Sequence, residues 1–266
     1  MIEISVVCIT ARPKPGLGRL VTSLLHQTVS TDRFELIYGD RQWSTREAII
    51  VQTLSESGLQ YQYVRDEPRK PGPCPAGARN ACIQRARGRW ILCIDDLTYL
   101  PKDLLEGHLD LMSQGFDAMC GSYLTLKDDG TIENEDERVL GRKSVGMKDQ
   151  LIHLSWWGMH MGFTKDAWGD VNGFDEAFDG VYGMEDIDFG HRLKGAGKAL
   201  AWEPALKVLC ERGSRHNDTH VQLLTSKMNA PTSWFRGGPV WRNDKLIHFM
   251  RAANVVRGER DERRRD

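Results

Sequence analysis

An apolar run from Trp90 to Ile94 ends abruptly in two adjacent carboxylates, Asp95 and Asp96. A short, continuous apolar run between turn residues is typical of a buried strand. In open α/β sheets, ligands bind beyond the carboxyl ends of such strands. We therefore predict that both aspartates lie at a ligand site, with a helix N-cap at Asp96 as the alternative interpretation.

The two carboxylates also indicate a partner of opposite charge. Asp95 and Asp96 repel each other unless a positive group lies between them. A divalent cation bound by hard oxygen ligands is the commonest solution. The pair by itself favours neither the cation site nor the helix cap.

The order of apolar patterns before this run predicts the fold class. Strand patterns alternate with helical ones, at residues 4–9, 17–27, 34–39, 49–54, 61–64 and 76–87. Apolar residues three and four positions apart mark the helices, as at Leu17, Leu20 and Val21. This alternation predicts an α/β fold with a mostly parallel, doubly wound sheet.

The second half of the chain has less regular patterns. Helical patterns cover residues 104–112 and 183–195, and strand patterns cover 117–124, 155–163, 200–202 and 206–210. The polar segment 127–150 reads as a surface excursion with a turn at 128–131. We predict one domain over residues 1–215 and a C-terminal extension over residues 216–266 that ends in a basic tail.

Composition narrows the class of protein. The chain has 266 residues, 40% hydrophobic content and a formal net charge of −1, which is typical of a globular domain and argues against extensive nucleic-acid binding. It has neither a leader pattern nor the ~20 apolar residues of a membrane span, so we expect a cytoplasmic protein. Its six cysteines are widely spaced, so we expect reduced core residues rather than disulfides or zinc ligands.

Seven short stretches occur in an order that resembles a known family. They are Ser5–Thr10, Leu24–Thr28, Glu35–Asp40, Gly77–Asn80, Asp95–Asp96 with Pro101 downstream, Gly173–Glu176 and Glu185–Asp186. Together they resemble the inverting glycosyltransferases of family 2, over about residues 3–216. The resemblance implies a single domain with the GT-A fold, a Rossmann-like α/β/α sandwich, and a nucleotide-sugar donor, with UDP as the default carrier.

The resemblance also assigns donor contacts. Thr10 and Asp40 would lie against the nucleotide base, and Asp95 would lie near the ribose. Arg79 would contact the nucleotide or its diphosphate, and Arg12 belongs to the same donor-binding group. Two of these side chains have simpler interpretations, because Asp40 could be a turn former and Arg79 could pair with another carboxylate.

By the same resemblance, Asp96 would bind Mn²⁺ or Mg²⁺ against the diphosphate. His216 would complete the metal shell, with His220 as the second choice and a solvated loop histidine as the alternative for either. The third position of the acidic motif is Leu97 rather than an aspartate. This departure leaves weak metal affinity, or metal independence, open.

Asp186 is the expected general base. The acceptor hydroxyl must lose its proton as it displaces the diphosphate, and a nearby carboxylate can take that proton. The resemblance gives this role to Asp186, with Glu185 as an acceptor-binding neighbour and with inversion at the anomeric carbon. Acidic residues in the first turn of a helix are otherwise ordinary partners of the helix dipole.

Three residues are expected at the acceptor: Trp156, Trp157 and His160. Aromatic faces stack on sugar rings or bases, although aromatic residues in strands are more often core residues. The acceptor itself is open between a glycan, a lipid-linked sugar and a hydroxylated nucleobase such as hydroxymethylpyrimidine in DNA. The sequence does not predict the oligomeric state.

Two other functions compete with sugar transfer. A nucleotidyltransferase also uses carboxylates and a metal at strand ends, but the chain lacks a glycine-rich phosphate loop after its first strand. A catalytically silent binding module of the same fold is favoured by Leu97 and disfavoured by the presence of Asp186.

Overall fold

The computed structural model describes residues 1–211, apart from Pro15, Arg69, Asp128, Glu137, Arg138, 140–155, Trp157 and 181–183. Its strands are β1 (Ile4–Thr10), β2 (Phe34–Asp40), β3 (Tyr61–Arg65), β4 (Trp90–Asp95), β5 (Thr98–Tyr99), β6 (Ala118–Leu126), β7 (Ile132–Glu135), β8 (His160–Thr164) and β9 (Leu200–Glu211). Its helices are α1 (Leu17–Leu25), α2 (Trp43–Glu56), α3 (Pro75–Arg85), α4 (Leu104–Ser113), α5 (Lys165–Asp170) and α6 (Glu185–Gly195), with a 3₁₀ turn, η2, at Glu176–Phe178.

These strands form one sheet in the order β3-β2-β1-β4-β8-β6-β9-β5, with β7 paired to β6. The first four are parallel, as expected. Strand β8 runs antiparallel to both β4 and β6, so the sheet is mixed beyond β4. An apolar run predicts a buried strand but not its direction, which is why the sequence overestimated the parallel part. The predicted α/β class is confirmed.

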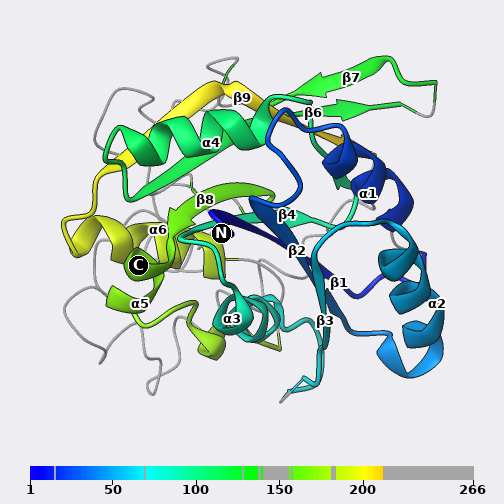
Figure 1. Ribbon diagram of the computed structural model, residues 1–266. Coiled ribbons are helices and arrows are strands. Elements are labelled where there is room, and N and C mark those ends of the chain that lie inside the picture. Colours follow the sequence, from blue (N-terminus) through cyan, green and yellow to red (C-terminus); the bar gives the residue numbers. More distant parts are fainter. Residues whose placement is uncertain are drawn as a thin grey trace, which may run out of the picture.

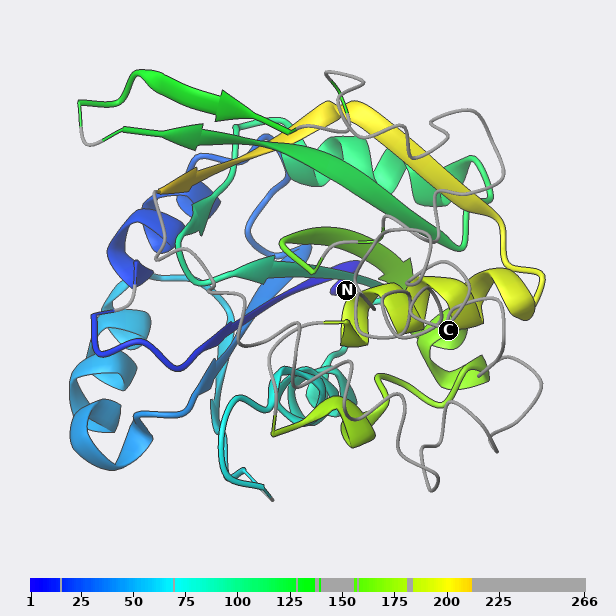
Figure 2. The same ribbon diagram turned by 180° about the vertical axis from the view of Figure 1, so that it is seen from behind.

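Helices cover both faces of the sheet, as Figures 1 and 2 show from opposite sides. Helices α1, α2 and α4 pack on one face, where Leu20, Leu54 and Leu105 join the side chains of alternate strand residues. Helices α3, α5 and α6 pack on the other face through residues such as Ile83 and Phe189. This is the predicted α/β/α sandwich. No helix in the described part of the chain is long and apolar enough to cross a membrane.

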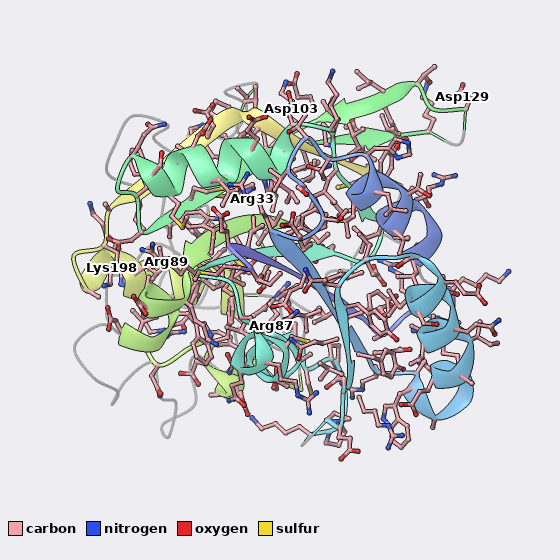
Figure 3. All side chains as sticks on the ribbon, viewed as in Figure 1. Arg33, Arg87, Arg89, Asp103, Asp129 and Lys198 are labelled. Atoms are coloured by element: carbon pink, nitrogen blue, oxygen red, sulfur yellow. The ribbon has the colours of Figure 1, made fainter. Side chains whose placement is uncertain are left out.

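Strands β6 and β7 form a hairpin that projects from one end of the sheet (Figure 1). Figure 3 labels Asp129 at its tip. The Asp129 carboxylate accepts hydrogen bonds from the backbone N–H and hydroxyl of Thr131, at 2.9 and 2.6 Å. These contacts confirm the predicted turn within the polar segment.

All six cysteines are buried and none forms a disulfide, as the sequence predicted. The proposed domain boundary between residues 215 and 216 lies outside the described residues and stays a prediction.

Candidate active site

The carboxyl ends of three parallel strands meet at one edge of the sheet. Thr10 at the end of β1 is in register with Asp40 at the end of β2, and Ile9 is in register with Asp95 at the end of β4. Two aspartates far apart in the sequence are thereby brought to the same edge, which agrees with the sequence prediction.

The turn after β1 closes over Asp96. The Thr10 hydroxyl donates a hydrogen bond to Asp96 Oδ2 at 2.7 Å, and Arg12 Nε donates to Oδ1 at 2.9 Å. The Asp96 backbone carbonyl accepts a hydrogen bond from the Gly16 N–H at 3.2 Å. Thr10 and Arg12 therefore lie at the expected site, where their polar groups hold Asp96 in place.

Asp95 and Asp96 offer a donor set that fits a hard divalent cation. Both are carboxylates at the same strand end, and the Asp95 side chain is 37% exposed. Mg²⁺ is usually bound by one or two carboxylates together with substrate phosphates and waters. Among the described residues, no group of three or more histidines, cysteines or carboxylates could hold a metal by itself. Within the described part of the chain, the protein ligands of such a site would be this pair.

Asp40 is held by a residue that the sequence analysis did not single out, Arg46 on α2. Arg46 Nε and Nη2 donate to the two Asp40 oxygens at 2.8 and 2.6 Å, and the hydroxyl of Tyr63 donates at 3.1 Å. The backbone N–H of Gln42 adds a fourth hydrogen bond, at 2.8 Å. Asp40 is fully buried, and its expected contact with a nucleotide base stays a prediction.

Arg46 also fixes the turn after β1. Its Nη1 donates to the backbone carbonyls of Arg12 and Pro13, at 2.5 and 3.0 Å. The Asp40–Arg46 pair is thus an anchor between β2, α2 and the turn that carries Arg12. In the sequence, an arginine in an amphipathic helix gives no signal of such a role.

Arg79 on α3 points inward rather than toward solvent. Its Nη1 donates to Glu185 Oε1 at 2.5 Å, and its Nη2 lies 3.6 Å from Asp95 Oδ1. Only 5% of Arg79 is exposed, and its guanidinium takes part in a buried ion pair, which is the alternative interpretation that the sequence left open. Burial alone would lower the pKa of Arg79, but Glu185 and Asp95 raise it, so the guanidinium stays charged.

Asp186 is the second residue of α6 and lies beside this ion pair. Its oxygens accept hydrogen bonds from the backbone N–H groups of Gly158 and Ile187, at 2.7 and 2.8 Å. Burial and the neighbouring Glu185 raise the pKa of Asp186 to about 7, against the opposing effect of Arg79. A carboxyl group with this pKa can both take and release a proton near neutral pH.

Met184, the residue before Glu185 and Asp186, has an unusual backbone conformation. Met184 has a φ of +79°, a region that side chains other than glycine rarely occupy. Such conformations cost about 1–3 kcal/mol and persist where the surroundings impose them. The start of α6 is thus held by its surroundings in a conformation that local preference disfavours.

The loop before α6 is clamped onto α3 by two residues of the 77–80 motif. The Asn80 side chain donates to the Phe174 carbonyl at 2.8 Å and accepts from the Phe174 N–H at 2.9 Å. Asp179 accepts from the Gly77 N–H at 3.0 Å, and any Cβ at Gly77 would lie 2.8 Å from that carboxylate. These positioning contacts join segments about 100 residues apart, which local patterns cannot reveal.

Two expected acceptor residues are buried in the core. Trp156 is fully buried among the side chains between the sheet and α3, α5 and α6. His160 is 2% exposed, and its Nε2 lies 2.9 Å from Nε2 of His108. Both side chains are enclosed by other protein groups, and their assignment to the acceptor stays a prediction. Aromatic letters in a strand pattern do not reveal which face of the sheet they occupy.

The two histidines belong to a chain of hydrogen bonds. Trp90 Nε1 donates to His108 Nδ1 at 3.1 Å, so His108 carries its proton on Nε2 and donates to His160. His160 in turn donates from Nδ1 to the Ser122 carbonyl at 3.0 Å. Both rings are thereby satisfied in the neutral form.

Three further expectations fall outside the described residues. They are the acceptor role of Trp157, the metal role of His216 and its alternative, His220.

A cavity of about 710 Å³ lies beside this edge, between the end of β3 and α3. Its lining includes Tyr63, Asp66, Gly77, Asn80 and Asp179 but none of Asp95, Asp96 and Asp186. The carboxylates of the candidate active site therefore lie outside this cavity.

Comparisons with known proteins agree with this geometry. The family model described as "Glycosyl transferase family 2" matches residues 5–180. None of the curated proteins matches the chain in sequence.

Solved structures are similar in fold at low sequence identity. The S. aureus TarS 1–349 structure in complex with UDP-GlcNAc has a TM-score of 0.66 and 14% identity, covering 99% of this chain and 78% of that one. A mannosyltransferase, PcManGT from Pyrobaculum calidifontis in complex with GDP-Man and Mn²⁺, has a TM-score of 0.62 and 15% identity, covering 96% and 75%. The chain spans 44% of a longer S. aureus TarS structure, which has a TM-score of 0.63 at 15% identity and covers 95% of this chain. These similarities confirm the predicted GT-A fold.

Proposed function

Because this chain belongs to glycosyltransferase family 2, we propose that it transfers a sugar from a nucleotide-sugar donor to an acceptor hydroxyl, with inversion at the anomeric carbon. The observation that carries the proposal is the buried Asp186, whose pKa of about 7 suits a general base. It lies beside the Arg79–Glu185 pair, and Arg79 also approaches Asp95 at the end of β4. A base and a donor-side carboxylate are thus joined through one side chain.

The donor side consists of Asp95, Asp96, Thr10 and Arg12 in this proposal. Arg12 is partly exposed, and its guanidinium suits a phosphate group as well as a carboxylate. Asp96, with Asp95 beside it, would hold Mn²⁺ or Mg²⁺; when bound, such a cation stabilises the charge that develops on the leaving diphosphate. UDP is the default carrier, in keeping with the UDP-GlcNAc complex of the similar TarS structure.

Asp186 acts on the acceptor side. The acceptor oxygen forms a bond to the anomeric carbon, the bond from that carbon to the diphosphate breaks, and the hydroxyl proton passes to the Asp186 carboxylate. The two backbone N–H groups that hold Asp186 fix the direction of its oxygens. Glu185, buried next to it, lowers the tendency of Asp186 to be charged and so keeps it basic.

The acceptor is proposed only as a hydroxyl compound: a glycan, a lipid-linked sugar or a hydroxylated nucleobase. If it were DNA, binding would weaken steeply with added salt, because phosphate contacts release counterions. A cytoplasmic location is part of the proposal and is supported by the six buried cysteines, which form no disulfide.

A thermal-shift panel tests this function. The ligands are UDP, GDP, UDP-GlcNAc and GDP-mannose with Mn²⁺, Mg²⁺ or EDTA, on wild type and on Asp96→Ala. A ligand present at ~100 times its dissociation constant stabilises the folded state by ~2.7 kcal/mol, which is readily measured. We expect one nucleotide to stabilise the wild type with metal and Asp96→Ala to lose that response.

Donor hydrolysis separates an enzyme from a silent binding module. The wild type should release nucleoside diphosphate from the donor that binds, and Asp186→Asn should bind the donor without releasing it. If no nucleotide in the panel shifts the wild type under any metal condition, the proposed function is wrong.

A further inference from the structure

We propose that Arg79 is a positioning residue, which holds the Asp186 end of α6 in place against the donor-side carboxylate Asp95. This inference rests on the proposed function. It differs from a donor contact, because Arg79 would act on the reaction through Glu185 and Asp186 rather than touch the nucleotide.

Arg79 is enclosed by protein groups from three elements. The side chain leaves α3 and reaches the start of α6 at Glu185 and the end of β4 at Asp95. Its guanidinium carbon lies 5.6 Å from the ring centroid of Phe174, and only 5% of the residue is exposed. The guanidinium is therefore surrounded by protein groups and presents no free edge to a phosphate.

Gly158 ties Arg79 directly to the base. Its backbone N–H holds Asp186 Oδ2 at 2.7 Å. A Cβ at Gly158 would lie 2.6 Å from Arg79 Nη2, so the backbone here packs against the guanidinium itself. Movement of Arg79 would therefore release one of the two hydrogen bonds that orient Asp186.

Charges of opposite sign lie around Asp186. Among the described residues, the ionised groups that face it are Glu185 on its own helix and Arg79 on α3, with Asp95 on β4 behind Arg79. Glu185 raises the pKa of Asp186 and Arg79 lowers it. Loss of the guanidinium would leave only the like charge, so a larger fraction of Asp186 would be protonated at neutral pH.

The test separates positioning from binding. We would compare Arg79→Met, which removes the charge, with Arg79→Lys, which keeps it. UDP affinity is measured by calorimetry with Mn²⁺, and hydrolysis of UDP-GlcNAc is followed by UDP release from pH 5 to 9. The matched control is Arg192→Met, because Arg192 is similarly buried and forms its ion pair with Asp188, on the same helix as Asp186.

For Arg79→Met we expect kcat to fall about tenfold or more, with the UDP dissociation constant within about threefold of wild type. The acid limb of the kcat/KM profile should move to higher pH, by about one unit. Arg79→Lys should restore most of this shift, and Arg192→Met should not cause it.

Two results would overturn the inference: a loss of UDP affinity as large as the loss of kcat, or an acid limb that stays where Arg192→Met leaves it. If Arg79→Met does not fold, Arg79→Gln, which also removes the charge but keeps a polar side chain beside Glu185, takes its place with the same readouts. A wild type that binds none of UDP, GDP, UDP-GlcNAc and GDP-mannose would instead refute the proposed function. The two failures are therefore distinguishable.

Discussion

Replacement of Arg46 by methionine should lower the free energy of unfolding far more than replacement of an ordinary surface arginine. The Asp40 carboxylate is fully buried, and Arg46 supplies two of its four hydrogen bonds. Arg46→Met leaves that carboxylate inside the protein without a counter-charge. Breaking a buried pair from one side costs about 3–5 kcal/mol, because the remaining charge is uncompensated.

For a chain of this size, each kcal/mol lowers Tm by roughly 2–4 °C. Arg46→Met should therefore lower Tm by roughly 6–20 °C in a thermal unfolding assay. The matched control is Arg33→Met. Arg33, labelled in Figure 3, binds Glu3 through the same two-pronged geometry, at 2.6 and 3.0 Å, but both side chains are exposed. An exposed pair of this kind contributes no more than about 1 kcal/mol.

The double variant Asp40→Asn/Arg46→Met tests the cause. With both charges removed, much of the lost stability should return, with a coupling energy of about 2 kcal/mol or more in the double-mutant cycle. The reasoning is refuted if Arg46→Met costs no more than Arg33→Met, or if the double variant is as unstable as the sum of the two single ones. Nucleotide affinity decides the role of Asp40, since a base contact would lose affinity in Asp40→Asn without loss of stability.

Three further predictions concern other buried groups. Asp186→Asn should lower turnover by about 10²- to 10⁴-fold; because burial raises the folded pKa of Asp186 from 3.8 to about 7, the same change should raise Tm at pH 8 but not at pH 4. Burial lowers the pKa of His108 below its usual 6.5, so the stability that its neutral form gives is present above pH 6.5 and is lost as the pH falls. In His108→Gln, the dependence of the unfolding free energy on pH, measured by urea unfolding from pH 7.5 to 5, should be weaker by up to ~1.4 kcal/mol per pH unit. An unchanged pH dependence would contradict this. Gly162→Ala should cost about 1–3 kcal/mol, because its Cβ would lie 2.6 Å from both His108 Nδ1 and Trp90 Nε1, whereas Gly169→Ala, which meets nothing within 4 Å, should cost nothing in the same unfolding assay.

Local patterns predicted the elements and the edge of the sheet where the site lies. Apolar runs and helical stripes depend on neighbours within a few residues, so the strands that end at Asp40 and Asp95 could be located from the sequence. The start of α6 at Glu185 was located in the same way. What the letters could not reveal is pairing across the fold. Arg79 and Glu185 are 106 residues apart, and nothing local to either indicates the other.

Burial was the second quantity that the sequence could not supply. Trp156 and His160 carry rings of the kind that stack on sugars or bases, yet both are buried in the core. His160 contacts His108 on helix α4. The apolar pattern of that helix predicts packing on the sheet but not this contact. Which aromatic residues stay open to ligands depends on such distant partners, and it becomes visible only in three dimensions.

The arrangement of arginines explains why Asp186, rather than a neighbour, can serve as the base. Four other carboxylates of the candidate active site form ion pairs with arginines, in the pairs Asp40–Arg46, Asp96–Arg12, Glu185–Arg79 and Asp95–Arg79. A carboxylate that faces a guanidinium is stabilised in its charged form and accepts a proton less readily. Asp186 instead receives its hydrogen bonds from the backbone N–H groups of Gly158 and Ile187. Burial, together with the neighbouring Glu185, raises the pKa of Asp186 to about 7, which suits a group that takes up a proton near neutral pH.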